Sequence, residues 1–388
     1  MTGSPVITRL QRWQVTVPSL PGLTDSVEFG KNPERHDHRY LLQLEDSDGF
    51  EGWGETVISG SLDVLDTALE RLAGQPVAGQ RTAFLDLWPA EALYWQRPAA
   101  PSPYAPNPAN LQHRLRHPMQ SAIEMALCDL TARRAGVSLC QLFGGPWRDR
   151  VLVDYWMPRM TPENARRCVA RGKELGFSGI KLKTTLEDPN VERLEAIQEE
   201  APDWKVTVDA NGRFYRLDDA LPVLRAMDAV GNVAIFEDPF PRFHLHDFVQ
   251  LRRQVDARVV VHIDPPESLW AVLQSGAAGG LNIDCHTGLH HWRMQAAAAE
   301  VANLPIWMGS GLDLGIRTAA ELQLAASAPN CLLPGDQAAP WLRESHLLVE
   351  DFVIRDGYVL LPEGPGLGIQ VDLDAVDRYC TDKRTFQP

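Results

Sequence analysis

The sequence is poor in positive charge, has few cysteines and contains no long apolar run. Lys and Arg number 37 against 51 Asp and Glu, which gives a formal net charge of -14. Nucleic-acid recognition relies on clustered Lys and Arg, and no such cluster occurs, so we expect no nucleic-acid partner. No stretch approaches the roughly 20 apolar residues of a membrane span. The first residues, MTGSPVITRLQRW, also lack the apolar core of a signal peptide.

The six cysteines show no CxxC spacing and no dense framework. Isolated cysteines of this kind are typical of reduced, mostly buried thiols. Together with the missing signal peptide and membrane span, they lead us to expect a cytoplasmic protein without a membrane partner.

What is present is an ordinary globular composition, 44% hydrophobic and 23% charged, on a chain of 388 residues. That length suits a large barrel or two associated domains. Alternating runs between Ile7 and Trp53, with a hairpin turn at Asp48-Gly49, predict strands. Helical periodicity predicts helices over 62–72 and 118–135. Residues 1–149 therefore predict an α+β domain, in which we expect the polar segment 18–38 to be a mobile loop.

From Val151 onwards, short apolar runs alternate with amphipathic stretches at intervals of roughly 20 to 30 residues. Eight β-like runs alternating with helices predict an α/β fold, a TIM-type barrel over residues 150–340. Active sites of such barrels lie at the C-terminal ends of the strands. We expect the tail, residues 341–388, to return to the first domain. The runs are VLVDYWM, GIKLK, KVTVDANG, VAIFEDPF, RVVVHIDPP, GLNIDCH, LPIWMG and CLLPGD.

Three acidic residues end consecutive runs of this barrel. Asp209, Glu237 and Asp264 follow one another at spacings of 28 and 27 residues, about one βα unit each. Barrel closure would bring the three carboxylates together, and such oxygen ligands suit Mg²⁺ or Mn²⁺. A single acid after a strand more often caps the next helix, but three in succession favour a metal site. Asn211 and Asp238 would support these ligands.

Two lysines end the run GIKLK, one unit before the first of these acids. Strand alternation points the side chains of Lys181 and Lys183 to the same face. In isolation they could be exposed lysines just past a strand end. Inside the barrel, burial and a neighbouring cation can lower the pKa of a lysine enough for it to act as a base. A metal facing them could bind a substrate carboxylate and stabilise the enediolate formed when the α-proton leaves.

The order and spacing of several motifs resemble the mandelate racemase and muconate lactonizing group of the enolase superfamily. The resemblance covers nearly the whole chain. It implies a modified (β/α)7β barrel, an α+β capping domain, Mg²⁺ (with Mn²⁺ possible in its place), a small carboxylate substrate and a homo-oligomer. The motifs are SAIEMALCDLTARRAGVSLCQLFGG at 121–145, KLK at 181–183, DAN at 209–211, EDP at 237–239 and GPGLG at 364–368.

The resemblance also implies roles for single residues. The second lysine of KxK is the usual base, so Lys183 would take the α-proton, while Lys181 would tune it or hold the carboxylate. Metal ligation carries over to Asp209, Glu237 and the acid after the fifth strand. Loops at 20–38 and 59–61 would close over the barrel mouth. As substrate-contacting residues we consider Trp53, Trp156, His36 and Arg35.

The chain departs from the family pattern after its fifth, sixth and seventh strands. The fifth reads HIDPPES, so Asp264 or Glu267 could be the ligand, and Asp264 is preferred because it directly ends the run. After the sixth strand, relatives carry a lysine where this chain has Asn282, Ile283 and Asp284, and no lysine occurs between residues 205 and 383. The seventh run, PIWMGSG, lacks the histidine of mandelate racemase-like members. Asn282 and Asp284 then become substrate-contacting or supporting residues.

Without either second base, a racemase or epimerase of a known type is doubtful, because inversion needs an acid and a base on opposite faces. We therefore expect a dehydratase, a lyase in which Lys183 acts on one face of a small hydroxy acid. Alternatives are a cycloisomerase or racemase that uses His286 as the opposing acid, and a metal-binding protein without turnover. Asp313, in GSGLDLG, would orient the substrate or hold a water, whereas His290 and His291 are expected to be structural or surface residues.

Overall fold

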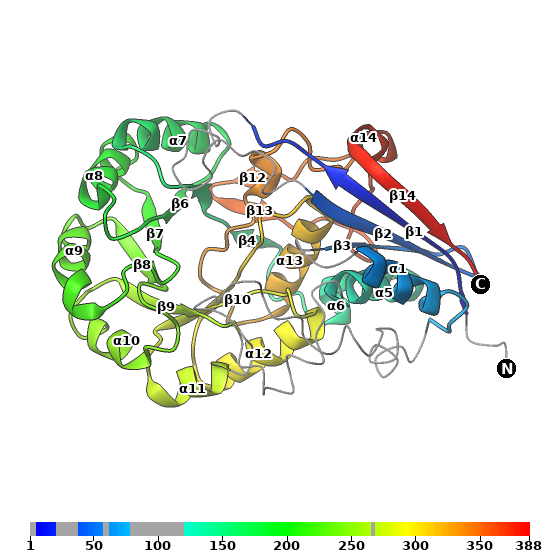
Figure 1. Ribbon diagram of the computed structural model, residues 1–388, viewed down its shortest axis with the longest axis horizontal. Helices are drawn as coiled ribbons and strands as arrows, with labels where there is room; N and C mark the ends of the chain where they lie inside the picture. The colour runs from blue at the N-terminus through cyan, green and yellow to red at the C-terminus, as the bar shows by residue number, and fades with distance from the viewer. Residues whose placement is uncertain (1–4, 21–37, 57–61, 78–119, 265–267) are drawn as a thin grey trace.

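The computed structural model describes residues 5–20, 38–56, 62–77, 120–264 and 268–388. A four-stranded antiparallel sheet in the order β14-β1-β2-β3 joins the two ends of the chain. Its strands are β1 (Ile7–Thr16), β2 (His38–Asp46), β3 (Glu51–Glu55) and β14 (Cys380–Phe386). Figure 1 shows the first and last strands side by side at one end of the molecule. The tail thus lies against the N-terminal sheet, while the expected boundaries at residues 149 and 340 stay predictions.

The turn expected at Asp48-Gly49 joins β2 to β3. Gly49 adopts a φ of 82°, which a residue without a side chain adopts readily. The Asp46 side chain accepts hydrogen bonds from the backbone N–H groups of Asp48 and Phe50, at 2.9 and 3.0 Å. The turn therefore fixes the register that places Trp53 opposite Gln43.

Two helices, α1 (Leu62–Leu72) and α5 (Gln120–Ala135), pack on this sheet through a shared apolar cluster that includes Ile7, Leu42 and Leu69. Strand β3 approaches α5 so closely that only glycine fits. A Cβ atom on Gly54 would lie 2.0 Å from the carbonyl oxygen of Ala122. The short helix α6 (Leu139–Leu142) then leads to the barrel, and α14 (Leu373–Tyr379) precedes the final strand.

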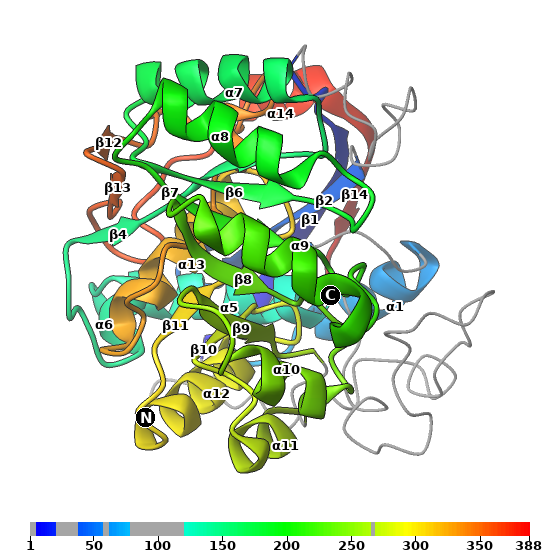
Figure 2. The same ribbon diagram turned by 90° about the vertical axis from the view of Figure 1, so that its left-hand side faces the viewer.

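The second part of the molecule is a curled parallel sheet in the order β11-β10-β9-β8-β7-β6-β5. Each strand is followed by a helix on the outside of the sheet, as Figure 2 shows for α8, α9 and α10. The strands are β5 (Tyr155–Met157), β6 (Gly179–Lys183), β7 (Lys205–Asp209), β8 (Val233–Glu237), β9 (Arg258–His262), β10 (Gly280–Ile283) and β11 (Ile306–Met308). The helices are α7 (Pro162–Glu174), α8 (Asn190–Glu200), α9 (Leu217–Ala229), α10 (Leu245–Leu251), α11 (Ser268–Ser275), α12 (Leu289–Val301) and α13 (Gly315–Ser327).

The eighth run closes the ring without forming a regular strand. Cys331 bridges in parallel to Ile306 of β11, and Gly335 bridges in parallel to Val153, just before β5. Seven βα units followed by this closing segment make the modified (β/α)7β barrel that the sequence predicted. A three-residue 3-10 helix, η2 (Ala339–Trp341), follows the segment. A small antiparallel ribbon of β4 (Arg150–Leu152), β12 (Ile354–Arg355) and β13 (Tyr358–Leu360) lies beside it.

Among the described helices, none combines the length and apolar character needed to cross a membrane.

Candidate active site

Lysines and carboxylates from three neighbouring strands meet at the C-terminal end of the barrel. The strand register pairs Lys183 with Asp209 and Asp209 with Glu237, so the three residues form one row across β6, β7 and β8. The Lys183 ammonium lies 2.5 Å from Asp209 Oδ2 and donates to Asn211 Oδ1 at 2.9 Å. The end of the lysine motif thus lies beside these acids, and Asn211 contacts Lys183 directly.

Lys181 lies one layer deeper and is surrounded by three carboxylates. Its Nζ is 2.7 Å from Glu237, 2.8 Å from Asp336 and 3.2 Å from Asp209. Burial acts to lower the pKa of Lys181, but Asp336, Glu237 and Asp209 together raise it well above its usual value. The three carboxylates therefore favour the ammonium form of Lys181.

The two carboxylates of the row differ in their proton affinity. Burial and the charge of Asp209 raise the pKa of Glu237 to about 7. Burial also acts to raise the pKa of Asp209, but Lys183 and Lys181 overcome it and hold the pKa below its usual value. Asn282 donates a hydrogen bond to Glu237 Oε1 at 2.5 Å. Glu237 Oε2 is buried without a properly aligned hydrogen bond among the described residues, although Lys181 Nζ lies near it.

A divalent metal fits this row only in part. Asp209 and Glu237 offer buried carboxylate oxygens, the kind of ligand that Mg²⁺ or Mn²⁺ prefers. One of these oxygens, Glu237 Oε2, has no hydrogen bond among the described residues. Asp264, the expected third ligand, lies past the end of β9 and turns outward. Its side chain is 49% exposed and its Oδ2 is 3.4 Å from Arg242 Nη1. Glu267, the alternative ligand, lies outside the described residues.

Within the described part of the chain, no group of three or more His, Cys, Asp or Glu residues is arranged to hold a metal ion. Strand β9 ends at His262, so Asp264 lies in the loop that follows it, and its role as the third ligand stays a prediction.

A second polar group occupies the opposite wall of the barrel. Seven strands and the closing segment form a ring of eight positions. Three of these positions lie between β6 and β10 in either direction, so the two strands face each other. Just after β10, Asp284 Oδ2 lies 3.1 Å from His286 Nδ1, and Asp284 Oδ1 accepts the backbone N–H of His286 at 2.8 Å. His286 Nε2 is buried without a hydrogen-bond partner among the described residues.

His262 and Arg242 complete this second group. His262 Nε2 lies 2.8 Å from Asp284 Oδ2, and its Nδ1 lies 2.9 Å from Arg242 Nη2. Arg242 also donates to Asp238 at 2.6 Å, and Asp238 accepts the backbone N–H of His262 at 2.9 Å. Asp238, expected to support a metal, therefore supports this histidine and arginine instead.

The neighbouring histidines have other partners. His290 Nδ1 contacts Glu124 of α5, and His291 Nδ1 lies 2.7 Å from the carbonyl oxygen of Thr287. Both histidines lie in the first turn of α12. They are structural residues in this arrangement, as the sequence suggested.

Asp313 belongs to a fully buried charge cluster between the cap and the barrel. Arg39 of β2 lies 3.5 Å from Asp313 and 4.0 Å from Glu55 of β3. Arg317 of α13 lies 3.5 Å from Asp313 and 3.2 Å from Glu321. Two arginines thus hold Asp313, one from the capping sheet and one from the helix that follows Asp313.

The two tryptophans proposed as substrate contacts are both buried. Trp53 stacks on Trp13 with ring centroids 5.5 Å apart, inside the capping domain. Trp156 is the strand partner of Lys181 inside the barrel. His36 and Arg35 lie outside the described residues.

Sequence reasoning missed three polar residues of the barrel mouth. Asp336 ends the eighth run, CLLPGD, and the strand-end rule used for the other acids would have found it. His262 lies inside the apolar run RVVVHI at an inward-facing position, which is an unusual place for a histidine. Arg242 follows the EDP motif and carried no recognisable signal.

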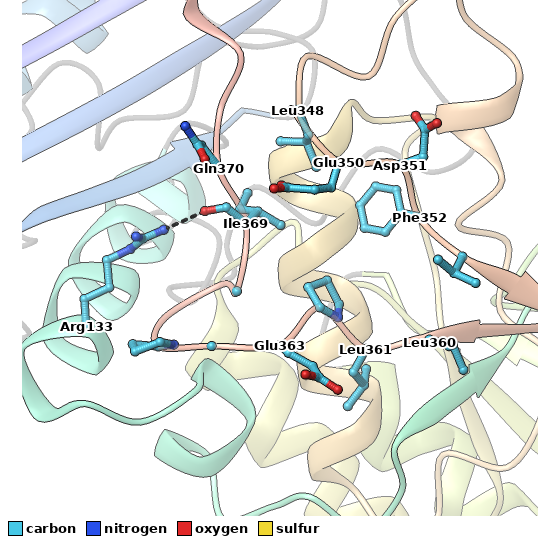
Figure 3. A pocket seen from close by; sticks show the side chains of 15 residues that line it. Arg133, Leu348, Glu350, Asp351, Phe352, Leu360, Leu361, Glu363, Ile369 and Gln370 are labelled. Carbon is cyan, nitrogen blue, oxygen red and sulfur yellow. Dashed lines mark hydrogen bonds between the residues drawn. The ribbon is translucent and has the colours of Figure 1, made fainter.

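A separate hollow lies on the C-terminal segment, away from this site. It is a cavity of about 500 Å³ bounded by Arg133 of α5 and by residues between 348 and 370. Figure 3 shows Arg133 donating to the carbonyl oxygen of Ile369, at 3.2 Å, and the side chains of Glu350, Asp351 and Glu363 around the opening. The cavity shares no residue with the strand-end row.

Fold and site together define a β/α-barrel enzyme with a capping domain. Residues 162–375 match the family model described as enolase C-terminal domain-like. Residues 33–144 match the model of the mandelate racemase / muconate lactonizing enzyme N-terminal domain. The chain therefore belongs to the mandelate racemase and muconate lactonizing family of the enolase superfamily.

Relatives of known name carry different activities. The N-succinylamino acid racemase of Thermus thermophilus is 30% identical over 290 residues, which cover 72% of this chain and 77% of the racemase. Muconate cycloisomerase 1 of Rhodococcus opacus is 31% identical over 272 residues, covering 67% of this chain and 71% of that enzyme. The N-succinyl Arg/Lys racemase of Bacillus cereus has the same fold, with a TM-score of 0.80 at 18% identity over 98% of this chain and 100% of that one.

Proposed function

We propose that the protein moves a proton at the carbon next to a substrate carboxylate, with Lys183 on one face and His286 on the other. The observation that carries the proposal is the position of Lys183 at the end of β6 and of His286 in the loop after β10, because these two strands face each other across the barrel. An opposed acid and base are what inversion at a carbon centre requires. The function supported best is thus an isomerase of the racemase or epimerase type.

In this reaction the neutral amine of Lys183 accepts the α-proton from one face. Its contacts with Asp209 and Asn211 hold the amine at the end of β6. The electrons of the broken C–H bond move into the carboxylate, where negative charge develops. The permanent ammonium of Lys181 favours that charge electrostatically, because it is preformed and largely shielded from water.

On the opposite face, protonated His286 returns a proton to the same carbon. Asp284 holds the Nδ1–H of this ring, which leaves Nε2 as the atom that exchanges a proton with the substrate. In the reverse direction His286 takes the proton and Lys183 returns one. The lysine missing after the sixth strand is therefore replaced in this proposal by a histidine two residues beyond Asp284.

Enzymes of this family generally use Mg²⁺. We infer that Asp209 and Glu237 would hold the cation in this chain, with Mn²⁺ as an alternative to Mg²⁺. When bound, it would supply further positive charge toward the substrate carboxylate. A small carboxylate substrate suits both the two lysines and this cation. The relatives, an N-succinylamino acid racemase and a muconate cycloisomerase, are named for substrates of that kind.

The dehydratase expected from the sequence stays a competing prediction. Its main ground was the lack of any group opposite Lys183, and the position of His286 removes that ground. Loss of a β-hydroxyl would still require the same abstraction by Lys183. The two reactions therefore differ in product and not in their first step.

Proton exchange in D₂O tests the proposal. Each enantiomer of a set of N-succinyl amino acids is incubated with the Mg²⁺-supplemented protein, and loss of the α-proton is followed by proton NMR. We expect exchange of both enantiomers with the parent. Lys183→Met should slow exchange of one enantiomer, and His286→Asn should slow exchange of the other, each by about 10²- to 10⁴-fold.

Matched controls separate the alternatives. His290→Asn changes a neighbouring histidine that contacts Glu124 and should leave both rates near those of the parent. If hydroxy acids instead yield 2-keto acids without inversion, the protein is a dehydratase. If no acid in either set exchanges its α-proton although Mg²⁺ binds, the enzymatic proposal is wrong.

A further inference from the structure

Four side chains form a continuous hydrogen-bonded chain on the wall opposite Lys183. Arg242 contacts His262, His262 contacts Asp284, and Asp284 contacts His286, at 2.9, 2.8 and 3.1 Å. The residues come from the loop after β8, from β9 and from the loop after β10. Three successive units of the barrel therefore contribute to the surroundings of one imidazole.

The donors and acceptors in this chain fix the tautomers of both rings. A guanidinium has only donors, so Arg242 Nη2 must donate to a lone pair on His262 Nδ1. His262 then carries its proton on Nε2 and donates it to Asp284 Oδ2. The same oxygen accepts from His286 Nδ1–H, which leaves the lone pair of neutral His286 on Nε2. This assignment follows from the partners of each ring.

Asp284 is held as an anion by this arrangement. Burial acts to raise its pKa, but the charge of His286 and the hydrogen bonds from both rings hold the pKa well below its usual value. It accepts hydrogen bonds from His262 Nε2 and from the backbone N–H of His286, and its Oδ2 lies 3.1 Å from His286 Nδ1. A carboxylate oxygen shared by two imidazoles has little freedom to turn.

Other charged groups lie around these four side chains. On one side, Arg242 is balanced by Asp238 at 2.6 Å and by the half-exposed Asp264. On the other side, Asp313 acts electrostatically with His286, and Arg39 and Arg317 hold Asp313 in place. Arg242 and Asp284 act on His262 with opposite signs, so this ring links an arginine to a carboxylate.

We propose that His262 is a positioning residue that, with Arg242, fixes Asp284 and so holds His286 in the Nδ1–H tautomer with Nε2 directed to the substrate. The proposal rests on the proposed function, because it assigns His262 a role through His286. His262 itself is not a proton donor to the substrate, because Asp284 and Arg242 already occupy both of its ring nitrogens. The residue at position 262 therefore determines the rate of proton exchange through His286.

The expected consequence is slower α-proton exchange of one enantiomer only. Replacing His262 by leucine removes one of the two donors to Asp284 Oδ2, which frees the carboxylate to turn away from His286. Exchange that depends on His286 should fall by at least about tenfold, and by no more than the 10²- to 10⁴-fold expected for removing a general acid or base. Exchange that depends on Lys183 should stay within about twofold, because the Lys183 side chain is held by Asp209 and Asn211.

The experiment compares His262→Leu with His262→Gln in the full-length protein. Glutamine can accept from Arg242 through Oε1 and donate to Asp284 through Nε2, so it should restore most of the His286-dependent exchange. The second readout is independent of activity. ¹⁵N NMR of the histidine rings should show His286 in the Nδ1–H form in the parent and in His262→Gln, and a shift toward the Nε2–H form in His262→Leu. His286→Asn identifies the signal.

The outcomes separate this inference from the proposed function. If His286→Asn leaves the exchange of both enantiomers unchanged, the proposed role of His286 is wrong. If His286→Asn slows one enantiomer but His262→Leu slows neither, and the tautomer of His286 is unchanged, the role of His262 is wrong. Equal slowing of both enantiomers by His262→Leu would indicate a general structural effect and would also overturn it.

Discussion

Lys181 lies where side chains from three separate parts of the barrel converge. Asp209, Glu237 and Asp336 come from β7, from β8 and from the closing segment after residue 331, and all three approach its ammonium within 3.2 Å. Buried like charges repel strongly unless a cation separates them. A single ammonium therefore holds together carboxylates that the barrel would otherwise bring into conflict. Lys181 and Lys183, two residues apart on one strand, thus have distinct roles.

Removing this ammonium should destabilise the barrel. Lys181→Met leaves the carboxylates of Asp336 and Glu237 buried without their cation, and breaking a buried ion pair from one side costs about 3–5 kcal/mol. The double variant Lys181→Met with Asp336→Asn should recover part of that loss, because it removes one of the stranded charges. Urea unfolding followed by circular dichroism measures both free energies of unfolding.

Lys173→Met serves as the matched control. Lys173 pairs with Glu200 at 3.9 Å on the protein surface, where ion pairs contribute about 0–1 kcal/mol. If Lys181→Met costs no more than Lys173→Met, the ammonium does not hold the carboxylates together.

At the scale of strands, the sequence allowed prediction of those residues whose position depends only on strand order and alternation. Lys183, Asp209 and Glu237 end successive apolar runs, and the ladder places them side by side. Asp264 follows β9 by two residues, and the end of a strand is not visible in an apolar run, so its role as a ligand stays a prediction. His262 was overlooked for the converse reason, since it is part of the strand itself.

The contact between β3 and α5 offers a test at the scale of elements. Gly54 lies against the backbone of α5, so Gly54→Ala would force the helix away from the sheet. Overpacking of this kind costs about 1–3 kcal/mol. We expect a cost at the upper end of that range, since the contacted atom is a backbone oxygen that cannot move alone. Thermal unfolding measures the loss, and Glu51→Ala on the same strand adds no volume and should cost much less.

At the scale of the whole molecule, buried charged residues join the cap to the barrel, and no local sequence pattern predicts these contacts. Arg39 and Glu55 come from the N-terminal sheet, whereas Asp313, Arg317 and Glu321 come from the barrel more than 250 residues later. Glu55 also accepts the backbone N–H groups of Leu314 and Arg317, at 2.6 and 2.9 Å. The sequence predicted two associated parts, but such long-range pairings depend on docking and could not be read from either part alone.

This joint should make the stability of the protein depend on pH. Burial and the charge of Asp313 raise the pKa of Glu55 to about 7, against about 4.5 in the unfolded chain. The stability that this group contributes is present below pH 4.5 and is lost as the pH rises through about 7, because the unfolded state releases its proton first. Asp154 and Glu237, whose pKa values are also raised to about 7, act in the same direction.

Glu55→Gln isolates the part that belongs to the joint. The backbone N–H groups of Leu314 and Arg317 bond to different oxygens of Glu55, so glutamine keeps an acceptor for one of them and has no proton to lose. The free energy of unfolding of Glu55→Gln, relative to the parent, should therefore increase between pH 5 and pH 8, while Glu51→Gln on the same strand should give a constant difference. Urea unfolding at a series of pH values measures both. A constant difference for Glu55→Gln would mean that Glu55 is already ionised in the folded protein at pH 5, with Arg39 and Arg317 holding its charge across the cap and the barrel.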